Sequence, residues 1–238
     1  MRSGYDPKYV KTEIKPVTVD ELLFRMQHDT LHLSPYRNIK WSMTVRSRFI
    51  ESILLGIPVP PVYVSADNNG QWILIDGIQR IRTLNIFLSE ASFILSGLEF
   101  FSELNGRKSG ELTPLLVNKI MNYVMQVVVF SPVTTKISQF LLVRRVCGGD
   151  REESILFSLY EGKVTDFLAE ASAGKTRSVK GQNNVLTFYQ KLFLQEGKIE
   201  SSGDPAVLLC HTCEYLETID EKEKMKLLAL YKEACSVY

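Results

Sequence analysis

The stretch Trp72-Ile73-Leu74-Ile75-Asp76-Gly77-Ile78-Gln79-Arg80 decides the fold, because it changes from one hydrophobic periodicity to another within two residues. Residues 72–75 are typical of a buried strand, and from Ile78 onward the apolar residues recur at helical spacing. The turn Asp67-Asn68-Asn69-Gly70 joins this strand to an earlier one at residues 60–64. The sequence therefore predicts a β-hairpin followed at once by a helix, with Asp76-Gly77 at the junction.

Two further helices are predicted on the N-terminal side of the hairpin. Thr18 and Glu21 form a capping-box pattern that opens a helix through Gln27. Ser42 is the expected N-cap of a second helix, which ends at Gly56. We expect the apolar stripe of this second helix to face the core: Val45, Phe49, Ile53 and Leu54.

The chain beyond residue 95 has mostly helical patterns. Helices are predicted at residues 113–123, 136–146, 152–160, 166–171, 185–194, 206–216 and 221–234. We therefore expect an α+β protein. Its small mixed α/β domain would span residues 1–95, and a helical lobe would span residues 96–238.

Composition excludes several classes of protein. The 238 residues include 28 basic and 27 acidic side chains, so no overall charge attracts DNA or a membrane, and a nucleic-acid site must be a local patch. Four cysteines are too few for a disulfide scaffold. The N-terminus lacks the apolar segment of a secretory signal, and the apolar runs are far shorter than the roughly 20 residues of a membrane helix. We expect a soluble, cytoplasmic protein with no membrane partner.

The Asp76-Gly77 junction is the strongest candidate for chemistry. Backbone N–H groups at the start of a helix attract phosphate, and a glycine lets a ligand approach the backbone. Arg80, in the first helical turn, is able to hold two phosphate oxygens at once. The alternative is an ordinary strand-to-helix turn in which Arg80 is solvated or paired with Asp76. The residues by themselves leave both interpretations open.

The surrounding residues resemble the N-terminal domain of the GmrSD-type restriction endonucleases, a family of the ParB/sulfiredoxin-like superfamily. The resemblance is specific over residues 35–88. There, Ser52-Ile53-Leu54-x-Gly56-x-Pro58-x-Pro60-Pro61 is followed, at the family's distance, by Asp76-Gly77-x-Gln79-Arg80-x-x-Thr83-Leu84. Beyond residue 88 the resemblance is fainter. Residues 143–149 occupy the place where the family often has a Phe-x-Arg-Ile-Asn-x-Gly-Gly segment.

The resemblance implies a nucleoside triphosphate ligand of unknown base, with Mg²⁺ as its candidate companion. Asp76, Gln79 and Arg80 match the motif residues that would act in hydrolysis of the triphosphate. The nucleotide and phosphate contacts would come from a wider set of matching residues: Arg37, Trp41, Gly77, Ile78, Arg80 and Arg145.

Several positions depart from the family pattern. Tyr36 replaces the glutamine of an upstream Gln-Arg pair, and Ser154 and Leu156 replace the polar pair of a later helix. Ile78 replaces the first motif glutamine, and Cys147 replaces a later asparagine. Sulfiredoxins have their reactive cysteine at the place of Ile78, so sulfiredoxin chemistry is excluded. An apolar side chain positions neither water nor a metal. We therefore expect the protein to keep phosphate binding while hydrolysis is weakened or lost.

Two functions therefore stay open. The first is a protein that binds a nucleotide, with or without hydrolysing it, and is linked to DNA restriction or phage–host conflict. The second is a non-catalytic ParB-like module that binds DNA or a protein. The sequence shows no His-Asn-His nuclease signature, so a nuclease would be unrecognised or supplied as a separate partner.

A local basic patch is expected between Leu33 and Ile50, a stretch without any acidic residue. With aromatic residues between them, its cations are candidates for contacts to a DNA backbone. Arg46 borders the apolar stripe and suits either site, whereas Arg48 points away from it. The alternative is a solvated helix face. The candidate DNA contacts are Lys40, Arg46, Arg48 and Arg82.

The pair Cys210-His-Thr-Cys213 has the spacing of two zinc ligands, but no second pair follows at metal-binding spacing. Apolar residues 207–209 precede it. We therefore expect both cysteines to pack within a helix, and no metal site is predicted.

Overall fold

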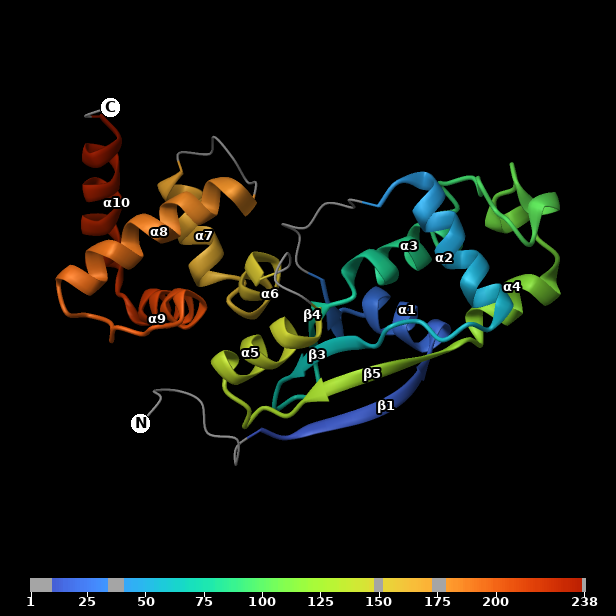
Figure 1. The fold of residues 1–238 in the computed structure, drawn as a ribbon, viewed down its shortest axis with the longest axis horizontal. Coiled ribbons are helices and arrows are strands. Elements are labelled where there is room, and N and C mark those ends of the chain that lie inside the picture. The colour runs from blue at the N-terminus through green and yellow to red at the C-terminus, as the bar shows by residue number, and fades with distance from the viewer. Residues whose placement is uncertain (1–9, 34–40, 148–151, 173–178, 237–238) are drawn as a thin grey trace. The chain divides into compact units, whose positions relative to one another are not determined.

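The computed structural model describes residues 10–33, 41–147, 152–172 and 179–236. These residues form two compact units. The α/β unit contains the described residues up to Thr134, and the helical unit contains those from Thr135 onward. In Figure 1 the α/β unit runs from blue to green and the helical unit from yellow-green to red.

The α/β unit is built on a five-stranded mixed sheet of order β1-β5-β3-β4-β2. The strands are β1 (Thr12–Thr18), β2 (Leu31–His32), β3 (Val62–Ala66), β4 (Trp72–Asp76) and β5 (Val124–Phe130). Two strand pairs are antiparallel, β1 with β5 and β3 with β4. Two are parallel, β3 with β5 and β2 with β4. The predicted hairpin is confirmed. Its turn is closed by Asp67 Oδ1, which accepts from the N–H groups of Asn69 and Gln71 at 2.9 and 2.8 Å.

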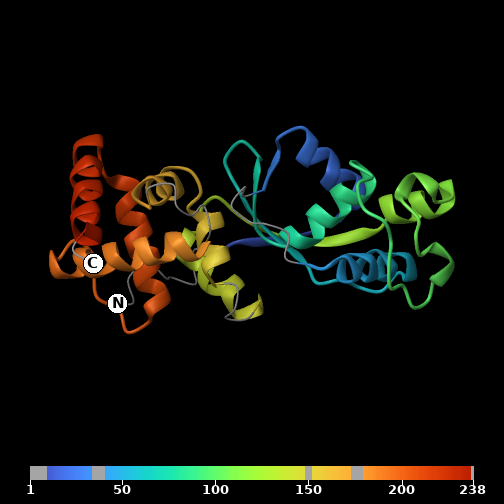
Figure 2. The same ribbon diagram turned by 90° about the horizontal axis from the view of Figure 1, so that it is seen from above.

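Helices α1 (Val19–Gln27), α2 (Met43–Leu55) and α3 (Ile78–Leu88) pack on this sheet, and α4 (Pro114–Met121) packs against α1 and α2. Figure 2 shows α3 between α1 and α2, both of which contact it. The predicted N-caps are confirmed, because Thr18 Oγ1 accepts from the Glu21 N–H at 3.2 Å and Ser42 Oγ from the Val45 N–H at 3.3 Å.

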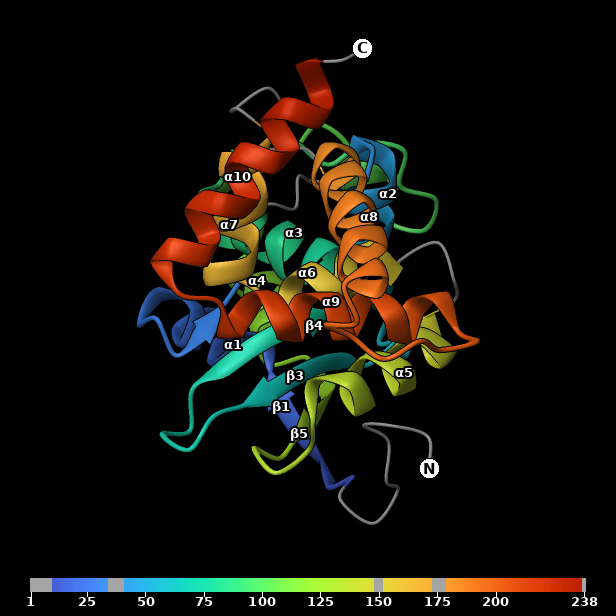
Figure 3. The same ribbon diagram turned by 90° about the vertical axis from the view of Figure 1, so that its left-hand side faces the viewer.

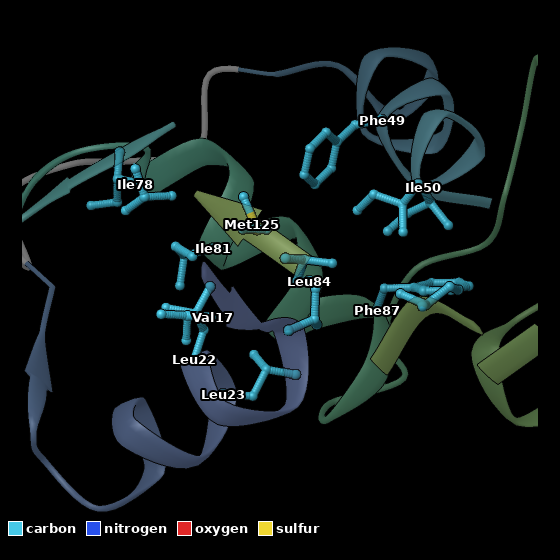
Figure 4. Packing of buried hydrophobic residues seen from close by; sticks show 14 of the residues in the cluster. Val17, Leu22, Leu23, Phe49, Ile50, Ile78, Ile81, Leu84, Phe87 and Met125 are labelled. Atoms are coloured by element: carbon cyan, nitrogen blue, oxygen red, sulfur yellow. The ribbon is translucent and has the colours of Figure 1, made fainter. Parts of the chain in front are cut away.

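The core of the α/β unit fixes the start of α3. Figure 4 shows Ile78, Ile81, Leu84 and Phe87 of this helix packed among buried side chains of α1, α2 and the sheet. Burying a side chain of this size contributes roughly 1.5–3 kcal/mol. The position of α3 is therefore set along its whole length, and with it the turn that precedes it.

The two units divide at residues 134 and 135, whereas the sequence placed a boundary at residue 95. The difference is due to β5, which pairs with β1 over seven residues and with β3 on its other side. Residues 124–130 therefore belong to the sheet. The helical unit begins later than expected, and β1 and β5 were not predicted.

The buried face of α2 is also rotated from the expected stripe. Phe49, Ile53 and Leu54 are buried as predicted, but Val45 is 44% exposed, so its placement in the core was wrong. Ser47 and Glu51 occupy the buried face instead. The stripe was read from apolar residues alone, and two polar residues take part in it.

The helical unit contains α5 (Lys136–Cys147), α6 (Glu152–Leu159), α7 (Lys163–Ala171), α8 (Val179–Gln195), α9 (Pro205–Thr218) and α10 (Glu221–Ser236). Each overlaps a predicted helical segment, although α8 begins six residues before the expected start at 185. Figure 3 shows α9 running across the unit, with α7 and α8 in contact with it.

Cys210 and Cys213 are buried on α9 and form no disulfide, which confirms that they pack within a helix. Burial raises the pKa of both thiols, so neither is activated as a thiolate. None of the helices in the described ranges is both long and apolar enough to cross a membrane.

Candidate functional site

The junction between β4 and α3 depends on Gly77. β4 ends at Asp76 and α3 begins at Ile78, so Gly77 is the N-cap, with φ of 107° and ψ of 7°. Residues with a side chain rarely adopt this left-handed conformation. A Cβ atom at Gly77 would lie 3.1 Å from Arg80 Nη2 and 3.1 Å from Val62 Cγ2. Backbone conformation and packing both require glycine here.

Arg80 supports this turn from inside the protein. Its Nη2 donates to the Pro61 carbonyl at 2.9 Å and to Asp76 Oδ2 at 3.3 Å. The Arg80 and Asp76 side chains are each 7% exposed. Of the two interpretations left open by the sequence, the structure shows the pairing of Arg80 with Asp76. The guanidinium thereby ties the end of β4 to the segment that enters β3.

The first turn of α3 presents backbone donors at this junction. Ile78 is only 5% exposed and its side chain lies in the core (Figure 4), so its backbone alone reaches the turn. The first N–H groups of a helix have no carbonyl of a preceding turn to bind, and Gly77 provides no side-chain cap. The Arg80 N–H already donates to the Gly77 carbonyl at 3.0 Å, so the donors in question are those that precede Arg80 in the helix. The partial positive charge at this end adds to the attraction of an anion. Chemically, the junction suits a phosphate.

Trp41 is held beside this turn by two of the predicted site residues. Gln79 Oε1 accepts from the Trp41 N–H at 3.3 Å, and Arg46 Nε donates to the Trp41 carbonyl at 3.2 Å. The Trp41 ring packs edge-on against Phe49, with ring centres 5.5 Å apart. The structure therefore brings Trp41 and Gln79 together. It adds Arg46, which had been grouped with the DNA contacts.

Arg48, another predicted DNA contact, binds the loop of residues 95–101. Its Nε donates to the Gly97 carbonyl at 3.2 Å, and its Nη2 lies 2.6 Å from Glu99 Oε1. The side chain is still 53% exposed. Arg82 lies on α3 and is partly buried. Any DNA phosphate at Arg48 would thus compete with Glu99.

Glu51 holds the same loop and was missed by the sequence analysis. Its carboxylate is buried and accepts from the N–H groups of Glu99, Phe100 and Phe101 at 3.0, 2.7 and 3.0 Å. Burial alone would raise the pKa of Glu51, but the three N–H groups outweigh it and hold the pKa below its ordinary value. The available signal was an acidic residue one position after Ile50, on the apolar face of a predicted helix.

The remaining predicted residues lie elsewhere. Arg145 is exposed on α5 in the helical unit, beside Arg144, which forms an ion pair with Asp204 at 2.9 Å. Arg37 and Lys40 lie outside the described residues. Within the described ranges, no three side chains of His, Cys, Asp or Glu come close enough together to hold a metal ion.

The chain matches the family model described as GmrSD restriction endonuclease, N-terminal domain, over residues 23–233. The match includes the turn at Gly77 and continues through the helical unit into α10, so one family domain spans both units. The resemblance seen over residues 35–88 thus extends over nearly the whole sequence. No curated protein and no solved structure matches the chain. The match over this length shows that the chain belongs to the family of GmrSD restriction endonuclease N-terminal domains.

Proposed function

We propose that the protein binds a nucleoside triphosphate, with its phosphates at the start of α3, and acts in DNA restriction. Membership in a restriction endonuclease family supports the second part. The first part rests on one observation: α3 is anchored in the core, yet it begins at a left-handed glycine without a side-chain cap. Such a helix start is suited to phosphate binding because its donors are already in place.

Each motif residue then has a distinct role in the proposal. Gly77 and the N–H groups after it hold phosphate, while the buried pair of Asp76 and Arg80 keeps the turn in shape. Gln79 positions Trp41 beside the nucleotide. Mg²⁺ would arrive with the phosphates. Since the Ile78 side chain is in the core and orients no water, we propose that hydrolysis is slow. The contacts of Arg37 and Arg145 with the nucleotide stay predictions.

Replacing Gln79 with glutamate is expected to weaken nucleotide binding at least about tenfold without lowering the melting temperature. A carboxylate oxygen is still able to accept from the Trp41 N–H, and a negative charge in the first turn favours the helix itself. The same charge repels a phosphate bound there. The measurement is titration calorimetry with ATP, GTP, CTP and UTP, with and without Mg²⁺.

The matched control is Gln126→Glu, the same change at an exposed position of β5. This variant should bind nucleotide as the wild type does. If Gln79→Glu also bound normally, the phosphates would not lie at the start of α3. If the wild type bound none of the four nucleotides, the nucleotide part of the proposal would be wrong, which leaves the non-catalytic binding module.

DNA is the proposed macromolecular partner, because a restriction system acts on DNA. Arg48 is the described cation best suited to a phosphate backbone, being half exposed although paired with Glu99. Releasing it with Glu99→Gln should raise affinity for DNA. Arg48→Ala should lower affinity equally for unrelated sequences and reduce the log–log salt slope by roughly 0.9.

Fluorescence anisotropy with two labelled duplexes of unrelated sequence measures both effects. Glu103→Gln, which removes an exposed charge that has no role in holding Arg48, is the control. A lower DNA affinity in Arg48→Ala together with a higher DNA affinity in Glu99→Gln would support a DNA contact at Arg48. Equal affinities for wild type and both variants would exclude Arg48. Absence of any binding at low salt would favour a protein partner such as a separate nuclease.

A further inference from the structure

The helical unit contains a cavity, wide open to solvent, that the proposed function does not use. Its volume is about 360 Å³, which lies within the usual range for small-molecule sites. One face of α9 forms a wall with His211, Glu214, Tyr215 and Thr218, which are spaced at helical periodicity. Residues 198–200 and Ile137 of α5 complete the lining. All of these residues belong to one compact unit.

The cation that lines this cavity is already neutralised by the protein. Lys198 Nζ lies 2.6 Å from Glu223 Oε1 and 3.1 Å from Glu196 Oε2. Glu223 also accepts from the Tyr215 hydroxyl at 2.7 Å, so it fixes both side chains. These carboxylates raise the pKa of Lys198. An anionic ligand near Lys198 would therefore be repelled by the two carboxylates that already pair with this lysine.

Negative charge remains in the cavity beyond this network. Glu200 and Glu214 both line it. Lys136, which is next to Ile137 and partly offsets the charge of Glu214, is itself paired with Glu217. With Lys198 paired to Glu196 and Glu223, the cavity presents an excess of carboxylates and favours a cation.

Glu214 is the group best placed to receive that cation. It is partly buried, and the contact from the Tyr160 hydroxyl to its Oε1 is long, at 3.4 Å. Burial raises the pKa of Glu214, although His211, which also lines the cavity, the Tyr160 hydroxyl and Lys136 act in the opposite direction. The net shift is upward, so these groups do not fully offset the cost of burying the charge. Beside it lie the apolar surfaces of Ile137, Ile199 and the Tyr215 ring.

We propose that this cavity binds a small organic cation, an amine or amidine attached to an apolar group. The charged nitrogen would pair with Glu214, and the apolar group would lie against Ile137 and the Tyr215 ring. A metal ion fits less well, because no three ligand side chains converge among the described residues. This site belongs to the helical unit, whereas the nucleotide site is proposed within the α/β unit.

The test compares benzamidine with benzamide, which has the same shape but no charge. Titration calorimetry should show that benzamidine binds at least tenfold more tightly than benzamide. Glu214→Gln keeps the size of the side chain and should reduce benzamidine affinity at least tenfold, with little change for benzamide. Glu221→Gln removes the same charge from an exposed side chain of α10 that does not line the cavity, and should change benzamidine affinity by about twofold or less.

Thr218→Trp is a second variant that does not depend on Glu214. Thr218 is exposed at the rim, so the larger ring should be accommodated without unfolding and should fill the cavity, abolishing benzamidine binding. Equal affinities for benzamidine and benzamide, or no benzamidine binding at millimolar concentration, would overturn the proposal. Equal losses of benzamidine affinity in Glu214→Gln and Glu221→Gln would also overturn it. Nucleotide titrations on the same variants keep this outcome distinct from failure of the α3 site.

Discussion

Arg80→Ala is expected to lower the free energy of unfolding by about 3–5 kcal/mol, the usual cost of removing one partner from a buried ion pair. The substitution leaves the Asp76 carboxylate, 7% exposed, without the guanidinium that faces it. It also removes the donor to the Pro61 carbonyl. Urea denaturation followed by circular dichroism measures the loss.

Arg82→Ala is the matched control, because it removes the same side chain two residues further along α3, where the position is only partly buried. We expect it to cost less than about 1 kcal/mol. A double-mutant cycle with Asp76→Ala should give a double variant more stable than the sum of the single losses predicts. A loss below about 1 kcal/mol for Arg80→Ala would contradict the buried pairing.

This expectation changes how the motif is tested. From the sequence, Arg80 was a candidate phosphate clamp, and its removal would then leave the fold unchanged. In the structure it supports the turn, so weakened nucleotide binding in Arg80→Ala would not distinguish lost contact from lost shape. Gln79→Glu is the better probe because it alters charge at the surface of the same turn while the buried pair stays intact.

Local chemistry explains which features of the fold could be predicted from the sequence. The helix caps at Thr18 and Ser42, the turn at Asp67 and the helix start after Gly77 each depend on residues within four positions of one another. Side-chain oxygens that cap a helix, and glycines that adopt a left-handed conformation, act over that range. Patterns of this kind can be recognised in a single sequence, and the structure confirms them.

Long-range pairing explains which features could not be predicted from the sequence. β1 and β5 are more than a hundred residues apart in sequence, and β1 is an edge strand with mostly exposed residues and Pro16. Neither strand has an alternating pattern strong enough to reveal the other. The same holds for the site, since the bond between Gln79 and the Trp41 backbone joins residues 38 positions apart.

Glu51 is the clearest example of such a long-range role, and Glu51→Ala should lower the free energy of unfolding by about 3 kcal/mol. A hydrogen bond to a charged group contributes about 1.5–3 kcal/mol, and here one carboxylate serves three backbone donors. Removing it leaves those donors without their acceptor. Urea denaturation at pH 7 measures the effect. The control is Glu103→Ala, at an exposed position, which should change the free energy of unfolding by less than about 0.5 kcal/mol.

The stabilisation by Glu51 should also depend on pH with a defined sign. Because its pKa in the folded protein is lowered from 4.5, its stabilising effect is fully present above that value. The effect is lost as pH falls below 4.5 and through the lowered pKa, where the folded carboxylate takes up a proton. The stability difference between wild type and Glu51→Gln, which cannot ionise, should therefore be constant from pH 7 to about 5.5 and shrink towards pH 3. A difference that stayed constant down to pH 3 would show that the loop is held by the shape of the side chain and not by its charge.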